Sequence, residues 1–195
     1  MLILQDSGNY NNETIWEWNM GEIYPKVIKH IGVSVSNVDD AVRWYRDKLG
    51  FNVIRGPIDI PDDCRSTGIV FSRLFGQRFK KARAAWLSSG NQVGLELIEF
   101  IDPKAEERSD SSEYWKTGFS HICITDPNIE ELCKIICNSG GEKLGGIQLG
   151  EIQTVDEKKS RRLVYCKDPF DNIIEIFTHS YEQFNANQIE TPSHV

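Results

Sequence analysis

Two short segments of the chain share one pattern of hydrophobic and polar positions. Residues 27–35 read VIKHIGVSV, and residues 118–125 read GFSHICIT. In each segment a histidine is followed by hydrophobic residues at every second position, with small residues between them. Because side chains alternate across a β-strand, this pattern predicts two strands, each with a hydrophobic face and a face that carries His30 or His121.

The segments that follow the two histidines also match one another. Asn37 and the acidic residues after it are typical of a helix start, and Gly50 is typical of a helix end. Between them the hydrophobic residues recur at helical spacing, which predicts an amphipathic helix with the stripe Val38, Ala41, Val42, Tyr45 and Leu49. In the second half, Asp126 and Pro127 precede a similar stripe, formed by Ile129, Leu132, Cys133 and Ile136.

Three strand-like runs follow each predicted helix. They are residues 51–54, 83–88 and 92–100 in the first half, and 142–149, 161–167 and 173–178 in the second. Each half therefore reads βαβββ, which predicts an α+β protein of two tandem modules. The expected order is an arm at 1–25, a first module at 26–101 with a long insertion near 57–80, a linker at 102–116, a second module at 117–180 and a tail at 181–195.

Composition and charge narrow the functional classes. The 195 residues suit one domain or two small modules packed together, and no apolar run approaches the ~20 residues of a membrane-spanning helix. The formal net charge of -7 argues against a broad nucleic-acid-binding surface. The first residues lack the features of a secretory signal, and the five cysteines form no CxxC pair, so we expect reduced thiols in a cytoplasmic protein without a membrane or nucleic-acid partner.

The candidate functional residues are two histidines and two glutamates, one of each per module. A histidine in a strand is more often a core residue than a ligand, but a buried carboxylate is costly unless a partner compensates it. If the two halves pair about a pseudo-twofold axis, His30, Glu96, His121 and Glu175 form a ligand set suited to zinc, nickel, cobalt, manganese or iron. Glu99 is the weaker candidate, because it lies three positions from Glu96 and points to the opposite face.

Four segments resemble one known superfamily. HIGVSVSNVDDAVRWYRDKLGF resembles the opening signature of the vicinal oxygen chelate superfamily, and GLELIEF, GFSHICIT and DPFDNIIEIF resemble its remaining ligand strands. The resemblance covers about residues 26–180. It implies two βαβββ modules that form a cup-shaped mixed sheet around one divalent metal ion. It also implies that His30, Glu96, His121 and Glu175 match the metal ligands of glyoxalase I, the lactoylglutathione lyase.

The same resemblance implies a mechanism. A substrate with two neighbouring oxygens binds the metal, which stabilises the enediolate formed when a proton leaves the carbon beside a carbonyl. Glu175 then moves the proton, together with Glu96. In glyoxalase I the substrate is the hemithioacetal of methylglyoxal and glutathione, so glutathione is the expected cosubstrate. We therefore expect a lyase or isomerase that acts on a small molecule and forms a homodimer.

Three other activities are compatible with the resemblance. Methylmalonyl-CoA epimerase is similar and acts on a branched acyl-CoA, but it commonly has glutamine at the position of Glu96. Extradiol dioxygenases of the same superfamily use two histidines and one glutamate on iron, yet their larger members place these ligands in one module. Bleomycin-resistance proteins have the fold without the metal and bind small molecules without catalysis.

Basic residues are concentrated in one part of this acidic chain. The predicted insertion and the strand after it contain Arg65, Arg73, Arg78, Lys80, Lys81 and Arg83. Guanidinium and ammonium groups bind carboxylates and phosphates. The four arginines are therefore candidate contacts for the carboxylates of glutathione or the phosphates of CoA. The alternative is a solvated helix face with no ligand.

Overall fold

The computed structural model of the protein describes residues 26–62, 66–106, 115–149 and 161–185. The predicted arm, Arg65 and parts of the predicted linker and tail lie outside these ranges. No helix in the part of the chain that the structure describes is long and apolar enough to span a membrane.

The first module forms a four-stranded mixed sheet, which we call the N-sheet. Its strands are β1 (His30–Ser34), β2 (Asn52–Pro61), β3 (Lys81–Ser88) and β4 (Gly94–Asp102). They lie in the order β1-β4-β3-β2, with β1 parallel to β4 and the other neighbours antiparallel. Helix α2 (Val38–Leu49) connects β1 to β2, and helix α3 (Ser66–Phe75) with the 3-10 helix η1 (Gly76–Arg78) lies between β2 and β3.

The second module repeats this topology in the C-sheet. Strands β5 (Ile122–Thr125), β6 (Glu142–Leu149), β7 (Arg162–Lys167) and β8 (Ile173–Phe177) lie in the order β5-β8-β7-β6, and β5 is parallel to β8. Helix α4 (Ile129–Asn138) connects β5 to β6, and the short helix α5 (Tyr181–Asn185) follows β8. The predicted pair of βαβββ modules is confirmed.

The predicted boundaries of β2 were wrong. Sequence reasoning ended this strand at residue 54 and assigned residues 57–80 to an insertion, whereas β2 extends to Pro61. It tolerates Pro57 and Pro61 because it is the edge strand of its sheet, where a missing backbone N–H need not break the ladder. The rest of the predicted insertion contains α3 and η1.

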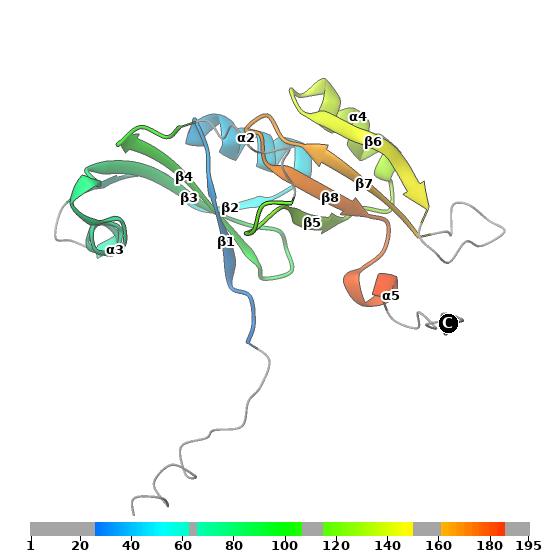
Figure 1. Ribbon diagram of the computed structural model, residues 1–195, viewed down its shortest axis with the longest axis horizontal. Helices are drawn as coiled ribbons and strands as arrows, with labels where there is room; N and C mark the ends of the chain where they lie inside the picture. Colours follow the sequence, from blue (N-terminus) through cyan, green and yellow to red (C-terminus); the bar gives the residue numbers. More distant parts are fainter. Residues whose placement is uncertain (1–25, 63–65, 107–114, 150–160, 186–195) are drawn as a thin grey trace, which may run out of the picture.

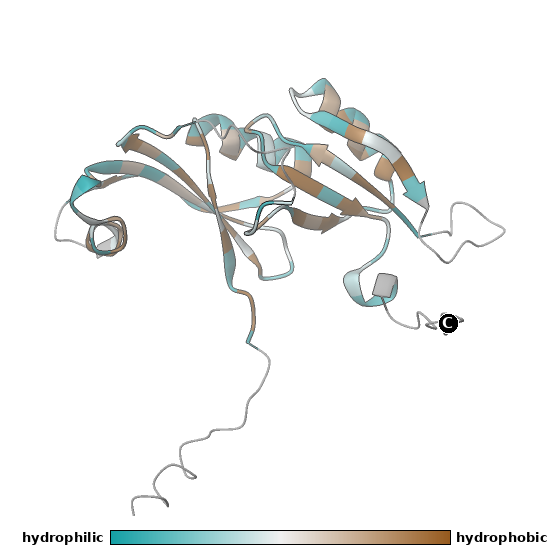
Figure 2. Ribbon diagram, viewed as in Figure 1, coloured by the Kyte–Doolittle hydropathy of each residue, from teal (hydrophilic) through white to brown (hydrophobic). Residues whose placement is uncertain are grey.

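The two modules share one hydrophobic core. Helices α2 and α4 lie on the same side of the two sheets (Figure 1), and their buried residues pack in one cluster with residues of β3, β4, β7 and β8. Strand β8 is mostly brown in Figure 2, and all five of its residues are buried. The two modules therefore share one core on the side of the sheets that carries α2 and α4.

Hydrogen bonds across the shared core fix the two modules relative to each other. The Trp44 indole N–H donates to the Ser139 carbonyl at 3.1 Å and hydroxyl at 2.9 Å. The buried Tyr45 hydroxyl donates to Asp168 Oδ2 at 2.6 Å. Asp168 also accepts from the backbone N–H groups of Phe170 and Asn172, so this one carboxylate joins helix α2 to the turn between β7 and β8.

We predict that Tyr45→Phe lowers the free energy of unfolding by about 1–3 kcal/mol, because it removes a donor from a buried carboxylate. Urea denaturation followed by circular dichroism measures the change. Tyr181→Phe is the matched control, since the Tyr181 side chain is exposed and its loss of a hydroxyl should cost less than about 0.5 kcal/mol. Equal effects of the two substitutions would contradict a structural role for the Tyr45 hydroxyl.

The effect of Tyr45→Phe should depend on pH. Burial raises the pKa of Asp168 above its ordinary value, and the hydrogen bond from Tyr45 opposes that rise. The raised pKa makes the contribution of Asp168 to stability largest at acid pH, and this contribution declines as pH rises through the folded pKa. Without Tyr45 the folded pKa rises further, so the destabilisation should be larger near pH ~7 than near pH ~4.

Candidate functional site

His30 and Glu96 form a pair on the N-sheet. Strands β1 and β4 are adjacent and parallel, with Gly32 opposite Glu96 and Gly94 opposite His30. The imidazole Nε2 lies 3.4 Å from Glu96 Oε2. The His30 side chain is 49% exposed and that of Glu96 17%, so the pair is open to solvent on the imidazole side.

His121 and Glu175 form the equivalent pair on the C-sheet. His121 immediately precedes β5, and Cys123 on β5 lies opposite Glu175 on β8. The imidazole Nε2 lies 3.0 Å from Glu175 Oε2, and the His121 side chain is 32% exposed. Each module thus places one imidazole against one carboxylate at the same point of its sheet.

A third strand adds an aromatic hydrogen-bond donor to each pair. Trp86 on β3 lies opposite Glu96, and its indole N–H donates to Glu96 Oε1 at 2.8 Å. Tyr165 on β7 lies opposite Glu175 in the same way. Burial, and then its hydrogen bond to Glu175, raise the pKa of the Tyr165 hydroxyl above its ordinary value, so it is protonated at neutral pH. Each glutamate therefore has two neighbours, a histidine and a neutral aromatic hydrogen-bond donor.

Sequence reasoning missed Trp86 and Tyr165. Each lies on the strand before the glutamate strand and faces the glutamate through antiparallel register. That register depends on the turn between the two strands, which is residues 89–93 in the first module and residues 168–172 in the second. An aromatic residue in the middle of the third strand of each half was the available signal.

Cys123 is a further neighbour of Glu175, and sequence reasoning treated it only as a small residue and a reduced thiol. It occupies the position on β5 that Gly32 occupies on β1. Burial, and then the negative charge of Glu175, raise the pKa of the Cys123 thiol to about 12. The thiol is therefore protonated at neutral pH and is a weak nucleophile.

The four predicted ligands form two pairs rather than one cluster. Among the described residues, no group of three or more His, Cys, Asp and Glu side chains is placed to hold a metal ion. The reason is the packing of the modules. Both helices turn toward the shared core, and each His–Glu pair lies on the face of its sheet that points away from that core. Their joint role as ligands stays a prediction.

Helix α3 lies on the same face of the N-sheet as the His30–Glu96 pair. Phe71 of α3 and Phe79 pack on Ala82, Ala84 and Ile98, which alternate with the core-facing residues of β3 and β4. Trp86 and Phe100 lie at the margin of this second cluster. In Figure 1, α3 is at one end of the N-sheet, on the side opposite α2. The insertion therefore forms a wall at one end of the ligand face.

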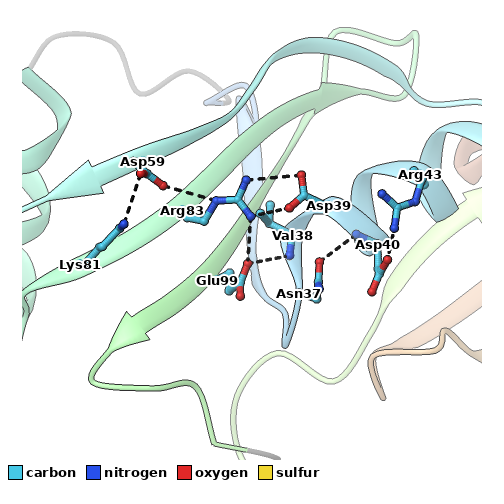
Figure 3. Close-up of polar contacts among 9 residues, drawn as sticks. All are labelled: Asn37, Val38, Asp39, Asp40, Arg43, Asp59, Lys81, Arg83 and Glu99. Carbon is cyan, nitrogen blue, oxygen red and sulfur yellow. Dashed lines mark hydrogen bonds and ion pairs between the residues drawn. The ribbon is translucent and has the colours of Figure 1, made fainter.

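The predicted substrate arginines have different positions. Arg73 and Arg78 are exposed on α3 and η1, so they lie on the wall beside the ligand face. Arg83 lies on the opposite face, where β3 contacts helix α2 (Figure 3). Its guanidinium donates to the Asp39 carboxylate and lies 3.4 Å from Asp59 Oδ1 and 3.8 Å from Glu99 Oε2. The structure does not bring Arg83 to either His–Glu pair.

The contacts of Arg83 instead hold the start of helix α2. The backbone N–H of Val38 donates to Glu99 Oε2 at 3.0 Å, and Asp40 N donates to the Asn37 cap at 3.0 Å. The hydrogen bond from Arg83 lowers the pKa of Asp39 below its ordinary value. Glu99 therefore has a structural partner, which agrees with the prediction that it faces away from Glu96.

We predict that Arg83→Met lowers the free energy of unfolding by about 1–3 kcal/mol, because Glu99 is then part-buried without its cation. Urea denaturation measures this change. Arg43→Met is the control, since Arg43 pairs with Asp40 at an exposed site on the same helix and should cost less than about 0.5 kcal/mol. A similar stability of both variants would contradict the role assigned to the Arg83 contacts.

Comparison with known proteins places the chain in a family. Residues 27–176 match the model of the glyoxalase/bleomycin resistance protein/dioxygenase superfamily, and the chain belongs to this superfamily. The resemblance found in the sequence is thereby confirmed. No curated protein sequence matches the chain.

Solved structures show the same fold at low sequence identity. A glyoxalase family protein from Bacillus cereus is 16% identical, with a TM-score of 0.62 over 82% of this chain and 96% of that one. A glyoxalase/bleomycin resistance protein/dioxygenase domain from Frankia is 13% identical, with a TM-score of 0.52 over 79% of this chain and 92% of that one. A glyoxalase I mutant from Zea mays is 15% identical, with a TM-score of 0.51 over 78% of this chain and 45% of that one.

Proposed function

We propose that this protein is a divalent-metal-dependent lyase or isomerase of the glyoxalase I type. It moves a proton on the carbon beside a carbonyl group of a small substrate or thiol adduct. The observation that carries the proposal is the duplicated pair, in which His30–Glu96 and His121–Glu175 occupy equivalent positions in the two modules. Membership of the superfamily, which includes glyoxalases, supports it.

The chemistry of the paired side chains fits a divalent metal ion. Imidazole nitrogen and carboxylate oxygen are the ligands that zinc and its neighbours in the first transition row accept. In each pair a ring nitrogen lies within 3.4 Å of a carboxylate oxygen, a separation that two ligands of one ion can have. Trp86 donates to the second oxygen of Glu96, and Tyr165 is a hydrogen-bond partner of Glu175, as outer partners of metal ligands are.

One protomer supplies two half-sites, so the complete site requires a second copy of the chain. Strands β1 and β5, which carry or follow the histidines, are edge strands of their sheets. Exposed hydrophobic side chains precede both strands, with Val27 92% exposed and Phe119 98% exposed. Exposed edges and apolar side chains favour association. In a twofold dimer, β1 of one protomer meets β5 of its partner, and each interface gathers two histidines and two glutamates.

The two glutamates have different roles in this proposal. The Trp86 indole N–H donates a hydrogen bond to Glu96 Oε1. Because an indole N–H can only donate, Glu96 is always the acceptor in this bond. Glu96 is thus held as a fixed anion. Glu175 lies in a more buried position on β8 and takes the proton from the substrate carbon, while Tyr165 orients its carboxylate. The metal ion, when bound, stabilises the negative charge left on the substrate oxygens.

We predict that the purified protein binds about one divalent metal ion per pair of half-sites, and that Glu96→Gln weakens metal binding by at least about tenfold. Glu99→Gln is the matched control, because Glu99 is three positions away on the opposite face of the same strand. Metal content is measured by mass spectrometry after incubation with zinc, nickel, cobalt or manganese. Absence of metal from the wild type under all four conditions would rule out the proposed function.

Turnover should depend on Glu175. Glu175→Gln is expected to reduce turnover by about 10²- to 10⁴-fold while the circular dichroism spectrum stays unchanged, because the substitution removes the base and keeps the shape. The assay compares the methylglyoxal–glutathione adduct with methylmalonyl-CoA, which separates a glyoxalase from an epimerase. Full turnover by Glu175→Gln on an accepted substrate would contradict the role of Glu175.

We predict that two inactive variants complement each other. One carries His30→Ala with Glu96→Gln, and the other His121→Ala with Glu175→Gln. If the half-sites join between protomers, a mixed dimer has one site with four intact ligands, so metal binding and turnover return after mixing and refolding. The recovery should approach about one quarter of the wild-type activity if subunits associate at random. No recovery in a stable mixed dimer would show that the pairs do not meet between protomers.

A further inference from the structure

We propose that Arg55 binds an anionic group, a carboxylate or a phosphate, at the end of the substrate remote from the reacting carbon. This inference rests on the proposed function for the identity of the reacting site. It concerns a different residue from the arginines that the sequence suggested.

Arg55 belongs to a row of side chains that crosses the whole N-sheet. Antiparallel register places Arg55 opposite Trp86, and Trp86 opposite Glu96, while parallel register places Glu96 opposite Gly32. Residues directly opposite one another in neighbouring strands share a face. Arg55 therefore lies on the face that carries the His30–Glu96 pair, whereas Arg83 lies on the helix face.

The positive charge of Arg55 is fixed in place but not neutralised. Its guanidinium carbon lies 5.2 Å from the centroid of the Trp86 ring, a cation–π distance. Arg55 is exposed and makes no ion pair with any residue that the structure describes, whereas Arg43, Arg46 and Arg83 each pair with an aspartate. Stacking leaves the N–H groups at the edge of the guanidinium free to bind an anion by two parallel hydrogen bonds.

The backbone of β2 is shaped around this position. The pairing with β3 shifts register on both sides of Arg55, between Val53 and Arg55 and again between Arg55 and Ile58. Such bulges redirect side chains and are common beside functional sites. Gly56 follows with φ of 91°, and a Cβ there would lie 2.6 Å from the Ala84 carbonyl oxygen, so only glycine fits.

The row also defines the length and direction of the ligand. Arg55 and Glu96 are two strands apart, which is about 10 Å across a sheet. A Cβ added at Gly32 would meet no atom within 4 Å beyond its chain neighbours, so space remains beside the Glu96 carboxylate. In the C-sheet the residue opposite Tyr165 is Leu144, which has no charge. The substrate is therefore a reactive carbonyl with a long anionic arm over the N-sheet, rather than a free small aldehyde.

Binding of two non-reacting probes by the full-length protein tests this inference. S-Methylglutathione presents carboxylates and coenzyme A presents phosphates, and isothermal titration calorimetry measures the Kd of each with zinc and after removal of metal. The wild type should bind one of them. Arg55→Gln should raise that Kd by about tenfold to hundredfold, and Arg55→Lys by less, since ammonium keeps the charge but not the forked geometry.

Arg43→Gln is the matched control, because it removes one positive charge from helix α2 and should leave the Kd unchanged. The inference is overturned if the wild type binds neither probe, or if Arg55→Gln binds within about twofold of the wild type while retaining the native circular dichroism spectrum. Arg55-dependent binding by a protein that takes up no metal would refute the proposed function and support the anion site. Metal uptake, together with probe binding that does not depend on Arg55, would support the proposed function and refute the anion site.

Discussion

A single hydrophobic core joins the two halves of this molecule, and the hydrogen bond from Tyr45 to the buried carboxylate of Asp168 lies across it. It joins helix α2 of the first module to the turn between β7 and β8 of the second, within a single hydrophobic core. Because both helices contribute to that core, both sheets turn their other faces outward. Each His–Glu pair is on such an outward face, and this is why one protomer contains two half-sites.

The half-sites are built by strand register rather than by loops. In both modules the histidine strand pairs in parallel with the glutamate strand, and an antiparallel neighbour brings an aromatic donor opposite the glutamate. The donors differ, since Trp86 is an indole and Tyr165 a phenol, and the positions beside them differ as well, with Gly32 in one module and Cys123 in the other. The two modules share one scaffold and give their carboxylates different surroundings.

The two faces of the N-sheet give arginines opposite functions. Arg83 is surrounded by Asp39, Asp59 and Glu99, so its charge is used to attach helix α2 to the sheet (Figure 3). Arg55 stacks on Trp86 and has no anionic partner among the described residues, so its charge remains available to a ligand. Strand register separates them, since Arg55 lies opposite Trp86, and Trp86 and Arg83 point to opposite faces of β3.

The sequence by itself determined the modules, their order of elements and the presence of one histidine and one glutamate in each, because hydrophobic periodicity and repetition are local properties that one strand or helix expresses directly. It also placed Glu99 on the face opposite Glu96. Only the tertiary structure decided the extent of β2, the partners of Arg83 and the alignment of Arg55 with Trp86, because these depend on register between strands distant in sequence and on bulges within them. The separation of the two half-sites has the same origin, since it follows from how the helices pack between modules.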